Sequence, residues 1–243
     1  MGYAWGGSPD AKATYVQSLF TALAHRYDCM TDVWTLGLHR RWKRQAIRLA
    51  ALKPGERVLD VCTGTGDMAR LARKQVAPAG LVVGVDYTLA MLQVAKRRVG
   101  QGVCLLCGDA KTIALLNEQF DIVMVAFGLR NVSESAVALK DIHRVLRPGG
   151  RLVILDFSTP EGAVLGAVHH LFYQVLMKYL GWAVAFHRDA HHYMRDSMRR
   201  WPRQQALSDH LGDAGYASVH CASLAGGFAA VHRGWKPAKA DFR

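Results

Sequence analysis

The strongest constraint on the fold is an alternation of short apolar runs and helical segments between residues 57 and 157. The apolar runs have the length of buried strands and cover 57–61, 80–86, 103–110, 120–127 and 151–157. Segments with helical spacing of apolar residues separate most of these runs. Continuous apolar strands that alternate with helices predict a parallel sheet covered on both faces. We therefore expect an α/β fold with a Rossmann-like sheet.

The regions outside this alternation extend the same sheet. Residues 218–224 and 228–236 flank an Ala-Gly-Gly turn and predict an antiparallel hairpin at the sheet edge. Residues 11–46 predict helices before the first strand, and residues 160–203 predict a helical insertion after the fifth. Internal repeats and low-complexity stretches are absent from the sequence. We expect a single domain over residues 1–243.

Smaller signals refine the element boundaries. Ser133 is expected to cap the helix over 133–146, and the Arg-Pro-Gly-Gly segment 147–150 is expected to end it. Cys104 and Cys107 have the spacing of half a zinc site, but residues three apart on a strand point to opposite faces. We interpret both cysteines as small core residues and expect no metal site.

The turn after the first strand predicts a ligand site. Residues 64–69 read Gly-Thr-Gly-Asp-Met-Ala, a loop whose backbone closely approaches a ligand at the carboxyl edge of the sheet. Asp86 ends the second strand, where it can accept hydrogen bonds from ribose hydroxyls. Asp60 and Asp67 flank the loop and would repel a pyrophosphate, but they suit an ammonium and a sulfonium. Asp109 follows the third strand and is placed for an adenine edge.

These carboxylates favour S-adenosylmethionine over a dinucleotide as the cofactor. An alternative is that Asp60 is an ordinary strand-end residue and Asp67 a partner of the helix dipole.

Six segments of the chain resemble one methyltransferase family closely. They are 27–44 (YDCMTDVWTLGLHRRWKR), 59–67 (LDVCTGTGD), 127–132 (FGLRNV), 143–158 (HRVLRPGGRLVILDFS), 192–202 (HYMRDSMRRWP) and 232–236 (HRGWK). The chain is thereby similar to class I S-adenosylmethionine-dependent methyltransferases, and within them to the UbiE/COQ5-type quinone C-methyltransferases of menaquinone and ubiquinone biosynthesis. Thr31, Ala126 and the pair Cys62-Thr63 depart from residues that are frequent in that family.

The resemblance implies that Thr65, Asp86, Asp109 and Ala110 bind the cofactor. Together with the loop and the strand ends, the expected cofactor-binding set is Asp60, Gly64, Thr65, Gly66, Asp86, Tyr87, Asp109 and Ala110.

Arg130 and Asn131 follow the fourth strand, at the sheet edge where ligands collect. Methylation of a quinol ring carbon requires a phenolate that pushes electron density onto that carbon. We expect Arg130 to stabilise the phenolate, directly or through a water that acts as the base, because a guanidinium is itself not a base. Asn131 is expected to orient the ring or the cofactor. The alternative is that Arg130 forms a structural pair with Asp156 or another acid.

Four further residues are candidates to line the quinol pocket or relay the proton. Tyr27 and Tyr193 complete the expected catalytic set, and Asp28 and His39 are weaker candidates. A lone histidine such as His39 is more often a structural residue than a base.

The sequence leaves several functions open. Demethylmenaquinol is the expected substrate, and a methoxylated polyprenyl benzoquinol is the alternative within the family. A different lipid or natural product, RNA methylation, and a non-catalytic complex member are further alternatives. The aromatic-Pro and catalytic-cysteine signatures of base methylation are not apparent in the sequence, so we expect no nucleic-acid partner.

The charge and one apolar segment predict contact with a membrane. The net charge of +12 and the pI of about 9.8 favour an anionic partner. Residues 163–186 are almost wholly apolar with one narrow polar stripe, which favours a lid or an interfacial helix over a spanning one. A core helix that faces the sheet is the alternative and would not exclude a lid. Arginines lie beside tryptophans in 39–44 and 194–203. We expect a cytoplasmic protein in peripheral contact with the inner face of the membrane, and a homodimer stays open.

Overall fold

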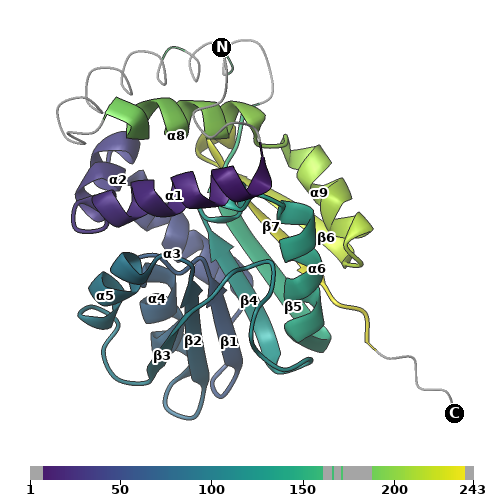
Figure 1. Ribbon diagram of the computed structural model, residues 1–243. Coiled ribbons are helices and arrows are strands. Elements are labelled where there is room, and N and C mark those ends of the chain that lie inside the picture. The colour runs from purple at the N-terminus through teal and green to yellow at the C-terminus, as the bar shows by residue number, and fades with distance from the viewer. Residues whose placement is uncertain (1–7, 161–165, 167–170, 172–187, 239–243) are drawn as a thin grey trace, which may run out of the picture.

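A computed structural model of the chain describes residues 8–160, 166, 171 and 188–238. Within these residues the chain forms a seven-stranded sheet with the order β3-β2-β1-β4-β5-β7-β6 (Figure 1). The strands are β1 Arg57–Val61, β2 Leu81–Asp86, β3 Val103–Cys107, β4 Phe120–Ala126, β5 Leu146–Phe157, β6 Ala217–Leu224 and β7 Ala229–Trp235.

Strands β1 to β5 are parallel, whereas β7 pairs with β5, and β6 with β7, in the antiparallel sense. The predicted mostly parallel sheet with an antiparallel C-terminal hairpin is confirmed.

The fifth strand begins earlier than predicted. Leu146 pairs with Phe120 and Arg151 with Ile122, so residues 147–150 form an irregular part of β5 instead of a helix end. The backbone of this part pairs with the far end of β7, because Gly149 N donates to the Lys236 carbonyl at 3.0 Å. The Pro-Gly segment therefore turns inside a strand, where Gly149 adopts a φ of +75°.

One face of the sheet is covered by α3 (Leu38–Ala50) and α4 (Asp67–Val76). Trp42 and Ala46 of α3 and Met68 of α4 pack in one buried cluster with Ile122 and Met124 of β4. Helix α5 (Leu89–Lys96) lies next to β2 and β3. Because both faces of the central strands carry apolar residues, this layer requires a second one opposite it.

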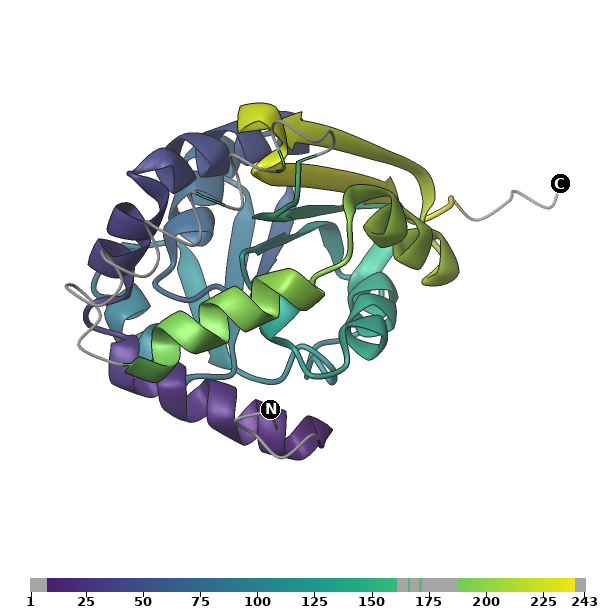
Figure 2. The same ribbon diagram turned by 90° about the horizontal axis from the view of Figure 1, so that it is seen from above.

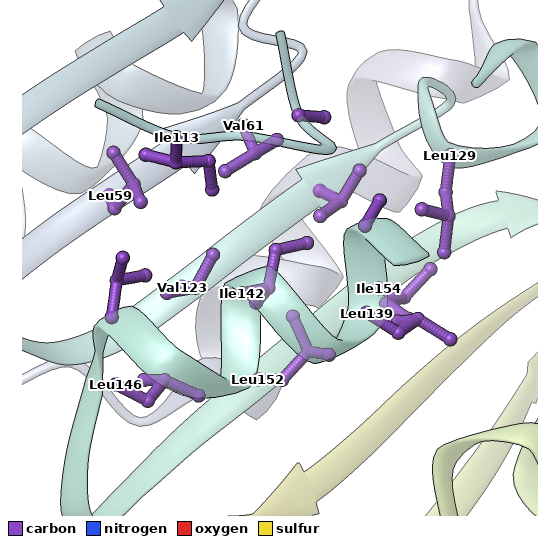
Figure 3. Packing of buried hydrophobic residues seen from close by; sticks show 14 of the residues in the cluster. Leu59, Val61, Ile113, Val123, Leu129, Leu139, Ile142, Leu146, Leu152 and Ile154 are labelled. Atoms are coloured by element: carbon purple, nitrogen blue, oxygen red, sulfur yellow. The ribbon is translucent and has the colours of Figure 1, made fainter. Parts of the chain in front are cut away.

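The opposite face is covered by α6 (Ser135–Val145) and α9 (Gln204–Asp213). Figure 3 shows Leu139 and Ile142 of α6 facing Val123, Leu152 and Ile154 of the sheet. All five side chains are almost completely buried, so this packing removes a large apolar area from water.

A third layer caps the edge at which the parallel strands end. Helices α1 (Pro9–Leu23), α2 (Tyr27–Thr35) and α8 (Arg188–Arg200) lie above that edge in Figure 1, and Figure 2 shows α8 crossing over the sheet. Leu19, Met30, Trp34, Tyr193 and Met194 form a separate buried cluster between these helices. The cap closes the place where the sequence predicts ligands.

The structure corrects two further expectations. Cys104 and Cys107 are exposed, because β3 is an edge strand, and they are not core residues. Ser133 does not cap α6, because Glu134 holds the N-cap position and makes no side-chain capping bond.

The expected helix over residues 163–186 lies almost entirely outside the described residues. In the parts of the chain that are described, no helix is both long enough and apolar enough to cross a bilayer.

Candidate active site

A cavity of about 110 Å³ lies at the carboxyl ends of the parallel strands. Val61 and Cys62 line it after β1, Asp86 at the end of β2, and Ala126 at the end of β4. Ala13, Val16 and Phe20 of α1 form part of its lining. The cavity therefore lies between the sheet edge and the cap, the usual place for a ligand in an open α/β sheet.

The glycine turn that borders this cavity uses left-handed backbone. Gly64 and Gly66 have φ of +56° and +82°, and Cys62 has φ of +55°. A Cβ at Gly66 would approach Val99 Cγ1 to 2.4 Å, so only glycine fits where α4 meets the end of α5. The turn is thereby fixed by close packing, with the Gly64 backbone at the cavity wall.

Asp86 is the carboxylate most firmly fixed at the cavity. One of its oxygens accepts from Gly64 N–H and the other from Thr88 N–H, each at 2.8 Å. Burial raises the pKa of Asp86, and the hydrogen bonds from Thr88 and Gly64 oppose that rise. Since a carboxylate has about four lone-pair sites, two backbone bonds leave it able to accept from a ligand hydroxyl.

The other end of the cavity is formed by the loops after β2 and β3. Asp109 and Ala110 line it, and Asp109 Oδ1 accepts from Lys111 N–H at 2.8 Å. Tyr87 lines the same end, and its carbonyl accepts from Gln17 Nε2 of α1 at 3.3 Å. These residues give this end a carboxylate beside apolar walls.

Three of the expected cofactor residues do not line the cavity: Asp60, Thr65 and Gly66. One oxygen of Asp60 accepts from Thr63 Oγ1 at 2.6 Å and from Ala69 N–H at 2.9 Å. Burial raises the pKa of this carboxyl to about 7.

Asp67 and Thr65 are engaged by residues that the sequence motifs did not single out as partners. Lys43 Nζ and Arg98 Nη2 lie 2.8 and 2.9 Å from the two oxygens of Asp67, so its charge is balanced. Thr65 Oγ1 donates to Asp28 at 2.8 Å, and Asp28 also pairs with Arg98. The loop is thus fastened to α2, α3 and the end of α5.

Arg130 is buried in the short helix η1 (Leu129–Asn131), and both terminal nitrogens of its guanidinium contact protein groups. Nη1 donates to Asp156 Oδ1 at 2.6 Å and to the Phe127 carbonyl at 2.7 Å. Nη2 lies 3.4 Å from Met194 Sδ of α8, and the guanidinium carbon lies 5.0 Å from the centre of the Phe157 ring. The pair with Asp156, one of the two sequence-based alternatives, is therefore present.

The two charges of this pair support each other. Burial disfavours the charged form of Arg130, yet Asp156, Tyr27 and Tyr193 together more than offset this, and the pKa of Arg130 is raised. Burial raises the pKa of Asp156, and Arg130 opposes that rise. Both groups are fully buried, so removal of either one would leave an uncompensated charge.

Asn131 and Tyr27 line the cavity on the side of Arg130. Asn131 Oδ1 accepts from the Tyr193 hydroxyl at 2.9 Å, and its Nδ2 donates to the Phe127 carbonyl at 3.3 Å. Burial raises the pKa of Tyr27 to about 12 and also raises that of Tyr193. Both phenols stay neutral at physiological pH and can act as hydrogen-bond donors.

The structure brings all four expected catalytic residues together where η1 meets the cap. Tyr27 and Asn131 line the cavity, whereas Arg130 and Tyr193 do not. His39 is not part of this group. Its Nε2 lies 2.8 Å from Asp32, and burial lowers its pKa.

Lys12 is a residue of this region that sequence reasoning missed. Its Nζ donates to the carbonyls of Arg130 and Val132, at 3.2 and 3.0 Å, and so ties α1 to the middle of η1 and to the residue that follows it. A single lysine in an N-terminal helix carries no motif, so only the tertiary contact reveals this role.

The cavity fits S-adenosylmethionine on its own chemistry. Asp86 offers a fixed acceptor beside the glycine turn, Asp109 offers a second one, and the remaining walls are largely apolar. The strand order, the glycine turn and these acidic strand ends define a class I S-adenosylmethionine-dependent methyltransferase.

Comparison with known proteins identifies the family. The chain matches the ubiE/COQ5 methyltransferase family over residues 8–236. It is 40% identical over 232 residues to the ubiquinone/menaquinone biosynthesis C-methyltransferase UbiE of Coxiella burnetii, covering 93% of each chain. The protein belongs to the ubiE/COQ5 methyltransferase family and is an S-adenosylmethionine-dependent methyltransferase.

Solved structures share the fold at low identity. A chain from the complex of the Haloferax volcanii Trm112 methyltransferase activator with a methyltransferase has a TM-score of 0.69 and 19% identity, over 91% of this chain and 97% of its own. A SAM-dependent methyltransferase from Aquifex aeolicus has a TM-score of 0.57 and 20% identity, over 80% and 89%. These likenesses concern the fold alone.

Proposed function

We propose that the protein transfers a methyl group to a ring carbon of a prenylated quinol. The observation that carries this proposal is a single cavity lined both by the cofactor acids Asp86 and Asp109 and by Tyr27, Phe127 and Asn131. A flat apolar ring with polar oxygens matches aromatic walls with a few neutral donors. The relative from Coxiella burnetii, whose name gives a quinone pathway, supports the same acceptor class.

The chemistry asks the protein to make a carbon atom nucleophilic. When bound, S-adenosylmethionine supplies an electrophilic methyl group on a sulfonium. The chain must hold the quinol in line with that group, stabilise a phenolate and exclude water. In this proposal, Tyr27 and the Asn131 amide donate hydrogen bonds to the quinol oxygens. The raised pKa of Tyr27, about 12, keeps its proton available for that bond.

Arg130 has two roles in the proposal. Its positive charge stabilises the phenolate, since the same charge lowers the pKa of both Tyr27 and Tyr193 against the effect of burial. It also fixes the Phe127 carbonyl, which is the acceptor of the Asn131 amide. Tyr193 acts through Asn131 as a positioning residue, because its hydroxyl holds the amide oxygen.

Asp86 and Asp109 are the proposed cofactor acids, with Gly64, Tyr87 and Ala110 beside them at the cavity. Asp60, Thr65 and Gly66 contribute by holding the loop, and Asp60 and Thr65 do so through their hydrogen bonds to Ala69 and Asp28.

Demethylmenaquinol is the proposed acceptor, and the methoxylated polyprenyl benzoquinol is the alternative. The relative's name includes both pathways, so it supports the two acceptors equally. A prenylated acceptor resides in lipid, and the net charge of +12 supports peripheral contact with an anionic membrane face. That contact is part of the proposal and is expected to weaken as salt increases.

The test is mass spectrometry of quinones after incubation of the purified chain with S-adenosylmethionine and each reduced acceptor in liposomes. We expect a gain of one methyl group on at least one acceptor, with the preferred ring assigning the pathway. If neither acceptor is methylated although the cofactor binds, the quinol proposal is wrong while the methyltransferase fold stands.

A further inference from the structure

A second cavity, of about 440 Å³, lies beside the active site and has no role in the proposed reaction. It is lined by Lys12 of α1, Leu129 of η1, the start of α6, the end of α8, and α9. It adjoins the first cavity at Val132 and Ser133, which line both. The buried Arg130 contributes to its wall, so the cavity lies on the far side of the catalytic segment.

Positive charge is concentrated on the wall of this cavity. Lys12, Lys140 and Arg200 line it, and among the described lining residues Asp213 is the one carboxylate. Burial, and then the nearby charge of Arg200, lower the pKa of Lys12. An anion in this cavity would interact favourably with all three cations.

Hydrogen-bond donors accompany these charges. Ser133 Oγ is buried and has no hydrogen-bond partner within the described parts of the chain. Its chain neighbour Glu134 holds the N-cap position of α6 without a side-chain capping bond. Ser135 and Ala136 of the first turn of α6 line the same cavity. Lys12 donates to two carbonyls and carries three N–H bonds, which leaves one donor for a ligand.

Part of the wall is apolar. Leu139 of α6, Trp201 and Leu207 line the cavity together with polar residues such as Ser197 and His210. Leu139 and Leu207 are almost completely buried in the core that supports α6 and α9. A small inorganic anion would leave these apolar side chains exposed to water, whereas an apolar stem would remove them from water.

We propose that this cavity binds a phosphate-bearing amphiphile, with its phosphate between Lys12, Lys140 and Arg200 and its apolar stem against Trp201 and Leu207. The phosphate of a lipid headgroup and that of a soluble alkyl phosphate share this chemistry. Because Lys12 also donates to the Arg130 and Val132 carbonyls, an occupied cavity would stabilise the segment that carries Arg130 and Asn131. The proposal does not depend on the identity of the methyl acceptor.

The test is direct binding by isothermal titration calorimetry on the full chain without added cofactor. The ligands are monomeric dihexanoyl phosphatidylglycerol, octyl phosphate and inorganic phosphate. We expect either amphiphile to bind about tenfold more tightly than inorganic phosphate, because only the amphiphiles bury the apolar wall. The tighter of the two amphiphiles assigns the source as a lipid or a soluble ester.

Variants locate the binding to this cavity. Lys140→Gln combined with Arg200→Gln should weaken amphiphile binding about tenfold, because two charge-assisted contacts are lost. The matched control is Arg48→Gln combined with Lys74→Gln, which removes two exposed cations from α3 and α4 on the other face of the sheet. Ser133→Ala should weaken binding by a smaller factor with little change in stability.

Three results would overturn the proposal: no binding of either amphiphile, equal affinity for inorganic phosphate, or equal weakening in the α3–α4 control. Each of these is a binding result, so it is independent of whether a quinol is methylated.

Discussion

The two sides of the active-site cavity are built in different ways. On the cofactor side, Asp86 is held by backbone N–H groups of the adjoining turns, from Gly64 and Thr88. On the acceptor side, Arg130 is held by Asp156 of β5 and contacts Met194 of α8. Both arrangements start from the sheet, and the second is completed when Met194 of the cap packs against the guanidinium.

The difference extends to charge. The carboxylate of Asp86 lines the cavity with lone pairs to spare, while the guanidinium of Arg130 is paired with a buried acid and keeps its charge near Tyr27 and Tyr193. The cofactor side therefore offers direct recognition. The acceptor side offers a rigid frame in which a paired charge fixes the polar groups that touch the ring.

The largest effect is expected from Arg130→Met. Turnover should fall about 100- to 1,000-fold, as for the loss of an oxyanion-stabilising group. The free energy of unfolding should also fall by about 3–5 kcal/mol, because Asp156 is left buried and unpaired. Steady-state kinetics and denaturant unfolding measure the two effects separately.

A double variant and a control separate the two effects of Arg130. Arg130→Met with Asp156→Leu should recover most of the stability without recovering turnover. Arg151→Met removes the cation of another well-shielded pair, with Glu56, in the middle of β5, and should affect stability far more than turnover. Recovery of turnover in the double variant would make the Arg130–Asp156 pair purely structural.

A smaller effect is expected from Asp86→Asn. The affinity for S-adenosylmethionine should fall about tenfold to 100-fold, because hydrogen bonds to a charged acceptor are lost. Calorimetric titration measures it, and the quinol KM should change little. Asp141→Asn is the matched control, since Asp141 also accepts from a backbone N–H, that of Ile113, but lies away from the cavity. An unchanged cofactor affinity would remove Asp86 from the proposed site.

Tyr193→Phe should lower turnover by about five- to tenfold and leave cofactor affinity unchanged. The variant loses the hydroxyl that holds Asn131 but keeps the packed ring. Tyr216→Phe serves as the control, because it removes a buried hydroxyl that donates to the Leu139 carbonyl in the core. If both variants lower turnover equally, Tyr193 has only a packing role.

Asp60→Asn should have the smallest effect on turnover below neutral pH, and its main effect should be on the pH dependence of stability. Burial raises the pKa of Asp60 from 3.8 to about 7. The folded chain therefore holds this proton more tightly than the unfolded chain. The resulting stability is complete below pH 3.8 and is lost as the pH rises through about 7.

Denaturant unfolding of Asp60→Asn and of the wild type at several pH values tests this effect. As the pH rises, the free energy of unfolding of the wild type should decline by at most about 1.4 kcal/mol per pH unit because of Asp60. The variant should lack this decline. Asp209→Asn, on the surface of α9, should reproduce the wild-type profile. Parallel profiles for Asp60→Asn and wild type would contradict the raised pKa.

Sequence patterns predicted the sheet well because its strands are apolar on both faces and regularly spaced. The strand ends and the glycine turn followed from the same pattern, which is why Gly64, Asp86 and Asp109 were expected at the cavity where they lie. The prediction that Cys104 is a core residue was wrong, because an apolar run does not reveal that its strand lies at the edge of the sheet.

The acceptor side was harder to predict. Pairing of Arg130 with Asp156 was one of two alternatives, since contacts between distant segments depend on strand order and cap position. The partners of Asp67 were missed because Lys43 and Arg98 come from other helices. Lys12 was missed for the same reason, because its partners are backbone carbonyls that leave no trace in sequence.

Methylation at carbon is the central claim, and a labelled methyl group tests it most directly. The chain is incubated with reduced demethylmenaquinone and S-adenosylmethionine bearing a trideuterated methyl group, and the product is analysed by tandem mass spectrometry and NMR. If the protein is a quinol C-methyltransferase, we expect one trideuterated methyl group on a ring carbon of the product. Label on a quinol oxygen, or no label on the quinol while the cofactor is bound, would contradict it.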